Sequence, residues 1–182
     1  MNIIVEGVDG VGKDSFIERL AELTDKKVMR GSSFEISELG PEKMYEKLKE
    51  MITSNDDLII NRFFYSNAVY GPLYDYPMLS HEQYVELNDL VCDDAIVYYL
   101  VANTEIIKER INNRGDDKVK PEEIQGIKDA YTEMWKKYTP RTLIVINTND
   151  NCILDKNSDI YKKVLSNDLK LEALSESIEE GI

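Results

Sequence analysis

Short, mostly apolar runs alternate with longer segments in which apolar residues recur at helical spacing. The apolar runs predict strands at 2–5, 27–29, 58–60, 95–101 and 142–146. The periodic segments predict helices at 13–23, 41–52, 80–91, 104–111 and 121–138. An aromatic-rich segment at 63–76 is assigned to neither class. This alternation predicts an α/β fold with a parallel sheet of about five strands and helices on both faces.

The pattern weakens near residue 150, where turn-like segments and two short helical patterns lead to an acidic end. We therefore expect one domain over 1–182, with a C-terminal appendage at about 150–182.

The net charge is −13, which disfavours binding to nucleic acid or to anionic membranes. We expect neither partner, and no apolar run approaches the ~20 residues that span a bilayer. Two cysteines without metal-type spacing, Cys92 and Cys152, and the absence of a leader pattern favour a cytoplasmic protein with reduced thiols.

The loop after the first expected strand is rich in glycine, and a helix is expected to begin near Lys13. Gly7, Gly12 and Lys13 match the first seven positions of the phosphate-binding motif G-x-x-x-x-G-K-[ST]. Asp14 takes the eighth position, and Ser15 follows it. Glycines let the backbone approach an anion, which the helix N-terminus and the lysine attract. The alternative is a plain glycine turn, but the context favours a nucleoside triphosphate site.

Three blocks, spanning most of residues 1–140, together resemble the thymidylate kinase family of P-loop nucleoside monophosphate kinases. The first block is the loop itself, in which that family carries an aspartate at the position of Asp9. The resemblance implies a three-layer P-loop NTPase fold with a lid, and places Asp9 beside the sugar and phosphate of the acceptor nucleotide. The alternative role for Asp9 is that of an Asx-type turn residue.

The second block is N-R-F-F-Y-S-N-A-V-Y-G at 61–71. It is similar to D-R-Y-x-x-S-x-x-A-Y-Q of thymidylate kinases and to E-R-S-x-x-S-x-x-V-F of deoxynucleoside kinases. The guanidinium of Arg62 could grip a phosphate bidentately, or it could form a surface ion pair. The aromatic residues could stack on a base or pack in the core. The residues expected to bind the acceptor are Asp9, Arg30, Arg62, Phe64, Tyr65, Ser66 and Tyr70.

The third block, at 104–135, resembles the helix that leads into the lid of these kinases, here expected at 113–121. Arg110 and Arg114 lie four residues apart and share a helical face. The resemblance implies that Arg114 closes over the transferring phosphoryl group; the alternative is a solvated basic turn. The residues expected to contact ATP are Gly7, Asp9, Gly10, Val11, Gly12, Lys13, Asp14, Ser15, Arg110 and Arg114.

Two departures from the family pattern lie where Mg²⁺ is expected. Asp14 replaces a hydroxyl residue, and Asn61 replaces the acidic residue before Arg62. Our hypothesis is that the carboxylate has moved from position 61 to position 14, so that Asp14, with Ser15, holds the metal. The glutamine expected after Tyr70 is also absent, which leaves the base open and allows a non-standard pyrimidine.

The expected reaction is transfer of the γ-phosphoryl group of ATP, with Mg²⁺, to a pyrimidine deoxynucleoside monophosphate. The catalytic residues would be Lys13, Arg62, Arg114 and Asp9, and we expect a homodimer whose other partners are ATP and a small deoxynucleotide. A deoxynucleoside kinase is the alternative; it needs a carboxylate base, for which Glu35 is the nearby candidate. A third possibility is an inactive nucleotide-binding regulator. A GTPase is less favoured, because the sequence lacks the N-K-x-D run that reads guanine.

Overall fold

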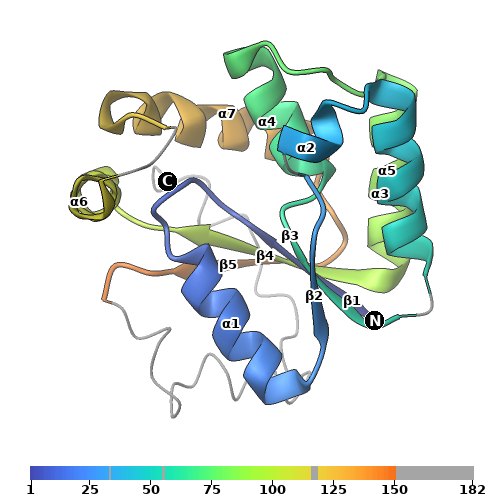
Figure 1. The fold of residues 1–182 in the computed structure, drawn as a ribbon, viewed down its shortest axis with the longest axis horizontal. Coiled ribbons are helices and arrows are strands. Elements are labelled where there is room, and N and C mark those ends of the chain that lie inside the picture. Colours follow the sequence, from blue (N-terminus) through green and yellow to red (C-terminus); the bar gives the residue numbers. More distant parts are fainter. Residues whose placement is uncertain (33, 55, 116–118, 151–182) are drawn as a thin grey trace.

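The five strands form one parallel sheet in the order β2-β3-β1-β4-β5 (Figure 1). The computed structural model describes residues 1–32, 34–54, 56–115 and 119–150. The strands are β1 (Asn2–Glu6), β2 (Lys27–Arg30), β3 (Leu58–Asn61), β4 (Ala95–Val101) and β5 (Leu143–Asn147). Each expected strand is present, which confirms the predicted α/β architecture.

Helices cover both faces of this sheet. They are α1 (Lys13–Thr24), α2 (Phe34–Ser37), α3 (Pro41–Thr53), α4 (Phe64–Tyr74), α5 (His81–Asp94), α6 (Thr104–Arg114), the 3₁₀ turn η1 (Pro121–Glu123) and α7 (Ile124–Lys137). One face of the sheet packs against α1, while α3, α4, α5 and α7 lie on the other (Figure 1). All five residues of β1 are buried, as expected for the central strand of a sheet covered on both sides.

The strand order reverses at β1. The path from β1 through α1 leads to β2 and β3 on one side, whereas β4 and β5 lie on the other. In open parallel sheets, ligands bind at the carboxyl ends of the strands where the strand order reverses. The loop after β1 and the ends of β3 and β4 meet at this place.

Helix α4 occupies much of the aromatic segment for which neither a helix nor a strand was predicted. Six of its residues are buried: Phe64, Tyr65, Ser66, Asn67, Val69 and Gly71. Because apolar residues surround this helix, its sequence lacks the one-sided stripe by which a surface helix is recognised. The helix contains Pro72 and ends at Asp75, whose φ is 56°.

Two expected segments extend beyond the described residues. The expected lid at 113–121 includes residues 116–118, and nearly all of the expected appendage lies at 151–182; both lie outside the described part. Helix α6 ends at Arg114 with Gly115 as its C-cap, and η1 begins at Pro121. Among the described helices, none is long and apolar enough to span a membrane.

Candidate active site

The loop between β1 and α1 depends on its glycines. Gly7, Gly10 and Gly12 have φ values of 142°, 77° and 99°, which side-chain-bearing residues rarely adopt. A Cβ atom on Gly7 would lie 2.7 Å from the carbonyl oxygen of Leu100 at the end of β4. The loop is therefore held against β4, and Gly12 directly precedes the N-terminus of α1. A helix N-terminus behind such a loop is suited to binding phosphate.

Lys13 is buried beneath this loop. Its side-chain nitrogen donates a hydrogen bond to the carbonyl oxygen of Val8 over 2.9 Å. Burial lowers the pKa of Lys13 to about 7, and the positive charge of Arg62 acts in the same direction. The carboxylates of Asp9, Asp14 and Glu6 oppose this shift. An anion bound beside Lys13 would likewise favour its protonated form.

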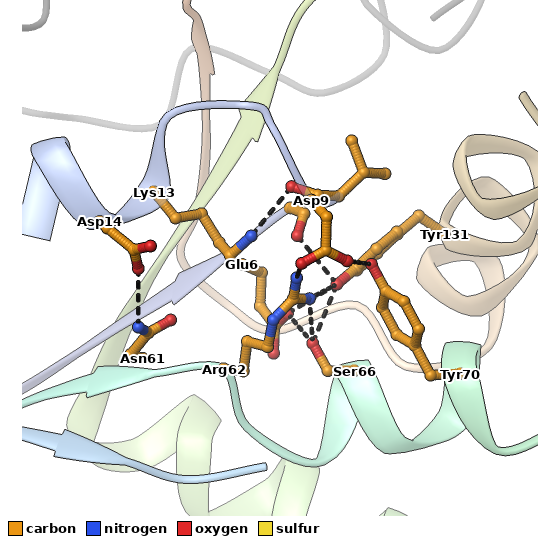
Figure 2. A network of polar contacts seen from close by, with 11 residues as sticks. Glu6, Asp9, Lys13, Asp14, Asn61, Arg62, Ser66, Tyr70 and Tyr131 are labelled. Carbon is orange, nitrogen blue, oxygen red and sulfur yellow. Dashed lines mark hydrogen bonds and ion pairs between the residues drawn. The ribbon is translucent and has the colours of Figure 1, made fainter. Parts of the chain in front are cut away.

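Asp9 joins the loop to the end of β3 (Figure 2). Its carboxylate accepts one hydrogen bond from Arg62 Nη2 over 2.9 Å and another from the Tyr70 hydroxyl over 2.8 Å. Burial alone would raise the pKa of Asp9, but the charges of Arg62 and Lys13 and the Tyr70 hydroxyl hold it at about 2. The Tyr70 ring also lies 4.9 Å from the guanidinium carbon of Arg62. The structure thus brings together four of the predicted site residues.

Arg62 has an unusual backbone conformation, with a φ of 64°. Its N–H donates to the Val5 carbonyl over 3.0 Å, and its own carbonyl accepts from Ser32 N over 3.0 Å. A Cβ atom on Gly31 would lie 2.2 Å from that carbonyl, so this close approach requires glycine. Non-glycine residues with positive φ persist where their surroundings hold them, often at functional sites. The loop after β2 therefore helps to fix the position of Arg62.

Arg62 is the centre of a cluster of hydrogen-bonded side chains formed with Glu6, Asp9, Ser66, Tyr70 and Tyr131. Two of these residues, Glu6 and Tyr131, were not predicted as site residues. The Glu6 carboxylate is fully buried and accepts from Ser66 Oγ over 2.6 Å and from the Tyr131 hydroxyl over 3.0 Å. Arg62 Nη1 donates to both Ser66 Oγ and the Tyr131 hydroxyl, each over 3.1 Å. Glu6 is the last residue of a buried strand, and Tyr131 lies on the buried face of a helix. In the sequence, both positions therefore look structural rather than functional. A charged residue at the end of a buried strand was the available signal.

Asp14 and Ser15 are exposed in the first turn of α1. Asn61 Nδ2 donates to Asp14 Oδ1 over 3.2 Å, so the two positions that depart from the family pattern are adjacent (Figure 2). Carboxylate and hydroxyl oxygens are suitable ligands for Mg²⁺, which commonly takes one or two carboxylates together with substrate phosphates. Within the described residues there is no cluster of three His, Cys, Asp or Glu side chains for a metal. These residues fit a phosphate-bridged Mg²⁺ better than a metal held by protein alone.

The remaining predicted residues lie in different surroundings. Phe64 and Tyr65 have no exposed surface and pack in the core, where the Tyr65 hydroxyl donates to Asn88. Arg30 is exposed at the end of β2, where it pairs in register with Asn61.

The two predicted arginines of α6 also differ in their surroundings. Arg110 donates to the Val11 carbonyl of the loop over 3.4 Å and to the Thr148 carbonyl over 2.6 Å. It thus connects the P-loop to the segment after β5. Arg114 is exposed at the end of α6.

A comparison with known proteins identifies a close relative of the chain. The SPbeta prophage-derived uncharacterized protein YorR of Bacillus subtilis strain 168 is 35% identical over 133 residues, covering 72% of this chain and 80% of YorR. The chain belongs to the YorR family. No protein-family model matches it. The crystal structure of Bacillus subtilis YorR, a complex with phosphorylated GDP, has a TM-score of 0.81 and 29% identity, covering 94% of this chain and 100% of that one.

More distant solved structures show the fold that the YorR family shares. A shikimate kinase from Acinetobacter baumannii has a TM-score of 0.57 at 18% identity, covering 93% of this chain and 95% of that one. A thymidylate kinase from Candida albicans has a TM-score of 0.57 at 14% identity, covering 92% of each chain. The chain therefore has the fold of P-loop kinases.

Proposed function

We propose that this protein is a nucleotide kinase that transfers the γ-phosphoryl group of ATP to a pyrimidine deoxynucleoside monophosphate. The observation that carries the proposal is the position of Arg62, beside Asp9 at the strand ends next to the P-loop lysine. A guanidinium in this place can hold the acceptor phosphate while Lys13 and the loop amides hold the donor phosphates. Phosphoryl transfer depends mainly on such positioning and charge stabilisation.

The carboxylates near Arg62 favour a phosphate acceptor over a hydroxyl acceptor. A nucleoside 5′-hydroxyl must lose a proton, which requires a base, whereas a phosphate oxygen needs none. With a pKa of about 2, Asp9 is a weak base, and Glu6 is sealed from solvent. Neither of these two carboxylates is both accessible and basic enough to activate a hydroxyl. The side chain of Glu35, the candidate base of the alternative, lies outside the described part.

Mg²⁺ would be held by Asp14 and Ser15 at the start of α1. When bound, the metal neutralises charge on the donor phosphates and orients them. Arg114, at the C-terminal end of α6, would add a positive charge over the transferring group. The stacked rings of Tyr70 and Tyr74, 5.9 Å apart, would offer an apolar surface beside the acceptor.

The test is a phosphorylation assay with ATP and Mg²⁺ against deoxynucleosides and deoxynucleoside monophosphates, with products identified by mass spectrometry. We expect diphosphates from dTMP, dUMP or dCMP, and loss of product in the Lys13→Ala and Arg62→Ala variants. The panel includes dGMP because the solved YorR complex contains a guanine nucleotide.

Each other result points to a different function. Product from dGMP alone would overturn the pyrimidine assignment, and product from nucleosides alone would indicate a deoxynucleoside kinase. ATP binding without any product would indicate a regulator. Light scattering on the same sample tests the expected homodimer.

A further inference from the structure

Glu6 is a fully buried carboxylate for which phosphoryl transfer provides no direct task. At the end of β1, its Oε1 accepts from the backbone N–H of Phe63 over 2.7 Å. Its Oε2 accepts from Ser66 Oγ over 2.6 Å and from the Tyr131 hydroxyl over 3.0 Å (Figure 2). Three elements, β1, α4 and α7, therefore meet at one carboxylate. A buried charge that is fully hydrogen-bonded in this way is typical of a network that fixes one arrangement.

The charge of Glu6 favours one direction for the hydroxyls of Ser66 and Tyr131. Burial raises the pKa of Glu6, while the charge of Arg62 and the donors Ser66, Phe63 N–H and Tyr131 favour the ionised form. An ionised carboxylate only accepts hydrogen bonds, and a serine or tyrosine hydroxyl has a single proton to donate. With Glu6 ionised, Ser66 and Tyr131 can both give their protons to it, which leaves their lone pairs for other donors. The two hydroxyl oxygens also lie 2.9 Å apart, and the Tyr131 hydroxyl lies 3.4 Å from the Gly7 carbonyl oxygen. Arg62 Nη1 donates to both of these oxygens, each over 3.1 Å. Glu6 thus makes two hydroxyl groups into acceptors for the guanidinium.

We propose that Glu6 is a positioning residue, which acts through the hydroxyls of Ser66 and Tyr131 to orient Arg62 toward the acceptor phosphate. Asp9 contacts the more open side of Arg62, and its side chain retains 34% exposure. Glu6 lies on the closed side and has no exposed surface. A phosphate that arrives at the open side meets a guanidinium already held from behind. The identity of the ligand rests on the proposed function, whereas the positioning of Arg62 does not.

A single near-isosteric substitution separates the positioning of Arg62 from the hydrogen bond that Glu6 accepts from the Phe63 backbone N–H. In Glu6→Gln, the Phe63 N–H can only donate, so the amide oxygen must face it and the amide NH₂ must face the two hydroxyls. The contact with the backbone is kept. The negative charge behind Arg62 is lost, and the group facing Ser66 and Tyr131 changes from acceptor to donor. The guanidinium of Arg62 then loses its fixed orientation.

Two measurements test the proposal. NMR of the ¹⁵N-labelled arginine side chains reports how freely the Arg62 guanidinium rotates, and steady-state kinetics report KM for the acceptor and for ATP. We expect restricted rotation in the wild type and faster rotation in Glu6→Gln. The acceptor KM should rise by about 10- to 100-fold, by analogy with the range found for residues that orient metal ligands. The KM for ATP should stay unchanged.

The Tyr84→Phe variant is the matched control. Tyr84 is 3% exposed and donates to Asn67 Oδ1 over 2.6 Å, away from this network. The Tyr84→Phe variant should change neither the NMR signal of the Arg62 side chain nor the acceptor KM. Ser66→Ala and Tyr131→Phe keep the contact between Glu6 and Phe63, so they test the same relay if Glu6→Gln fails to fold.

Unchanged Arg62 rotation and an unchanged acceptor KM in the folded variants would overturn the proposal. So would an equal rise of both KM values, which indicates general distortion of the site. If the wild type phosphorylates no nucleotide, the proposed function fails, while the NMR comparison still decides whether Glu6 positions Arg62.

Discussion

The side-chain amide of Asn61 donates a hydrogen bond to the carboxylate of Asp14 over 3.2 Å, which joins the end of β3 to the start of α1. The resemblance to thymidylate kinases implies an acidic residue at position 61 and a hydroxyl residue at position 14. The other side-chain atom of Asn61, Oδ1, is buried without a hydrogen-bond partner among the described residues. The two departures therefore belong to one local arrangement, as the relocation hypothesis requires.

Exchanging the two side chains tests that hypothesis. We expect Asp14→Ser to lower Mg²⁺-dependent turnover about 10- to 100-fold, because the metal loses its carboxylate. Adding Asn61→Asp should restore much of the loss, since the carboxylate returns from the neighbouring strand end. Turnover is measured across a Mg²⁺ titration, with Asn61→Asp alone as the control. A double variant no more active than Asp14→Ser would contradict the relocation.

The ion pair between Asp9 and Arg62 makes stability depend on pH at the acid end. The pKa of Asp9 lies at about 2 in the folded protein, below its ordinary value of 3.8. The stabilisation is therefore complete by about pH 5 and is lost as the pH falls toward 2. We expect the stability difference between wild type and Asp9→Asn, measured by urea denaturation, to be largest near pH 5, where Lys13 is still protonated, and to shrink as the pH falls toward 2. A difference that persists unchanged toward pH 2 would rule out this pair as its source.

Gly31 permits the close contact with the Arg62 carbonyl. In Gly31→Ala, the new methyl group would lie 2.2 Å from that oxygen, so the backbone must shift. We expect a loss of about 1–3 kcal/mol in the free energy of unfolding, as for other overpacked sites, and weaker acceptor binding. Gly126→Ala is the control, because a methyl group there meets no atom within 4 Å. That change should stabilise α7 by about 0.5–1 kcal/mol. Similar effects of the two substitutions would argue against a role for the contact.

Thr148 supports the P-loop from the segment after β5. It is fully buried, and its hydroxyl donates to the Val11 carbonyl over 2.7 Å. Thr148→Val keeps the shape but leaves that carbonyl poorly satisfied, which costs about 1–3 kcal/mol. We expect a higher KM for ATP with an unchanged KM for the acceptor. Thr53→Val, at an exposed helix end, should change neither constant. A change confined to the acceptor KM would disprove the support of the donor side.

The fold and the glycine loop with Lys13 follow from local sequence signals. The strands are short apolar runs, and the loop from Gly7 to Lys13 needs glycine and lysine at fixed spacing. Helix α4 could not be predicted in this way, because it is buried around most of its circumference. The order of the strands also depends on contacts between segments that are distant in the chain.

The cluster of polar side chains around Arg62 was predicted only in part. Arg62 and Asp9 stood out because of their motif, yet Glu6 and Tyr131 did not. Tyr131 lies 125 residues from Glu6, and its ring fits the periodic core stripe of α7 equally well without a hydroxyl. Periodicity indicates which face of a helix is buried, but it does not indicate which buried polar groups meet. That information comes from the tertiary structure alone.

The position of Tyr131 on α7 also gives the protein a built-in optical reporter. The chain contains one tryptophan, Trp135, one helical turn beyond Tyr131, and the two ring centroids lie 6.3 Å apart. Trp135 is almost fully buried among Tyr65, Tyr99 and Tyr131. A rearrangement at the Tyr131 hydroxyl would therefore change the surroundings of Trp135, the only tryptophan of the chain. Its intrinsic emission offers a label-free signal for events at the polar cluster around Arg62.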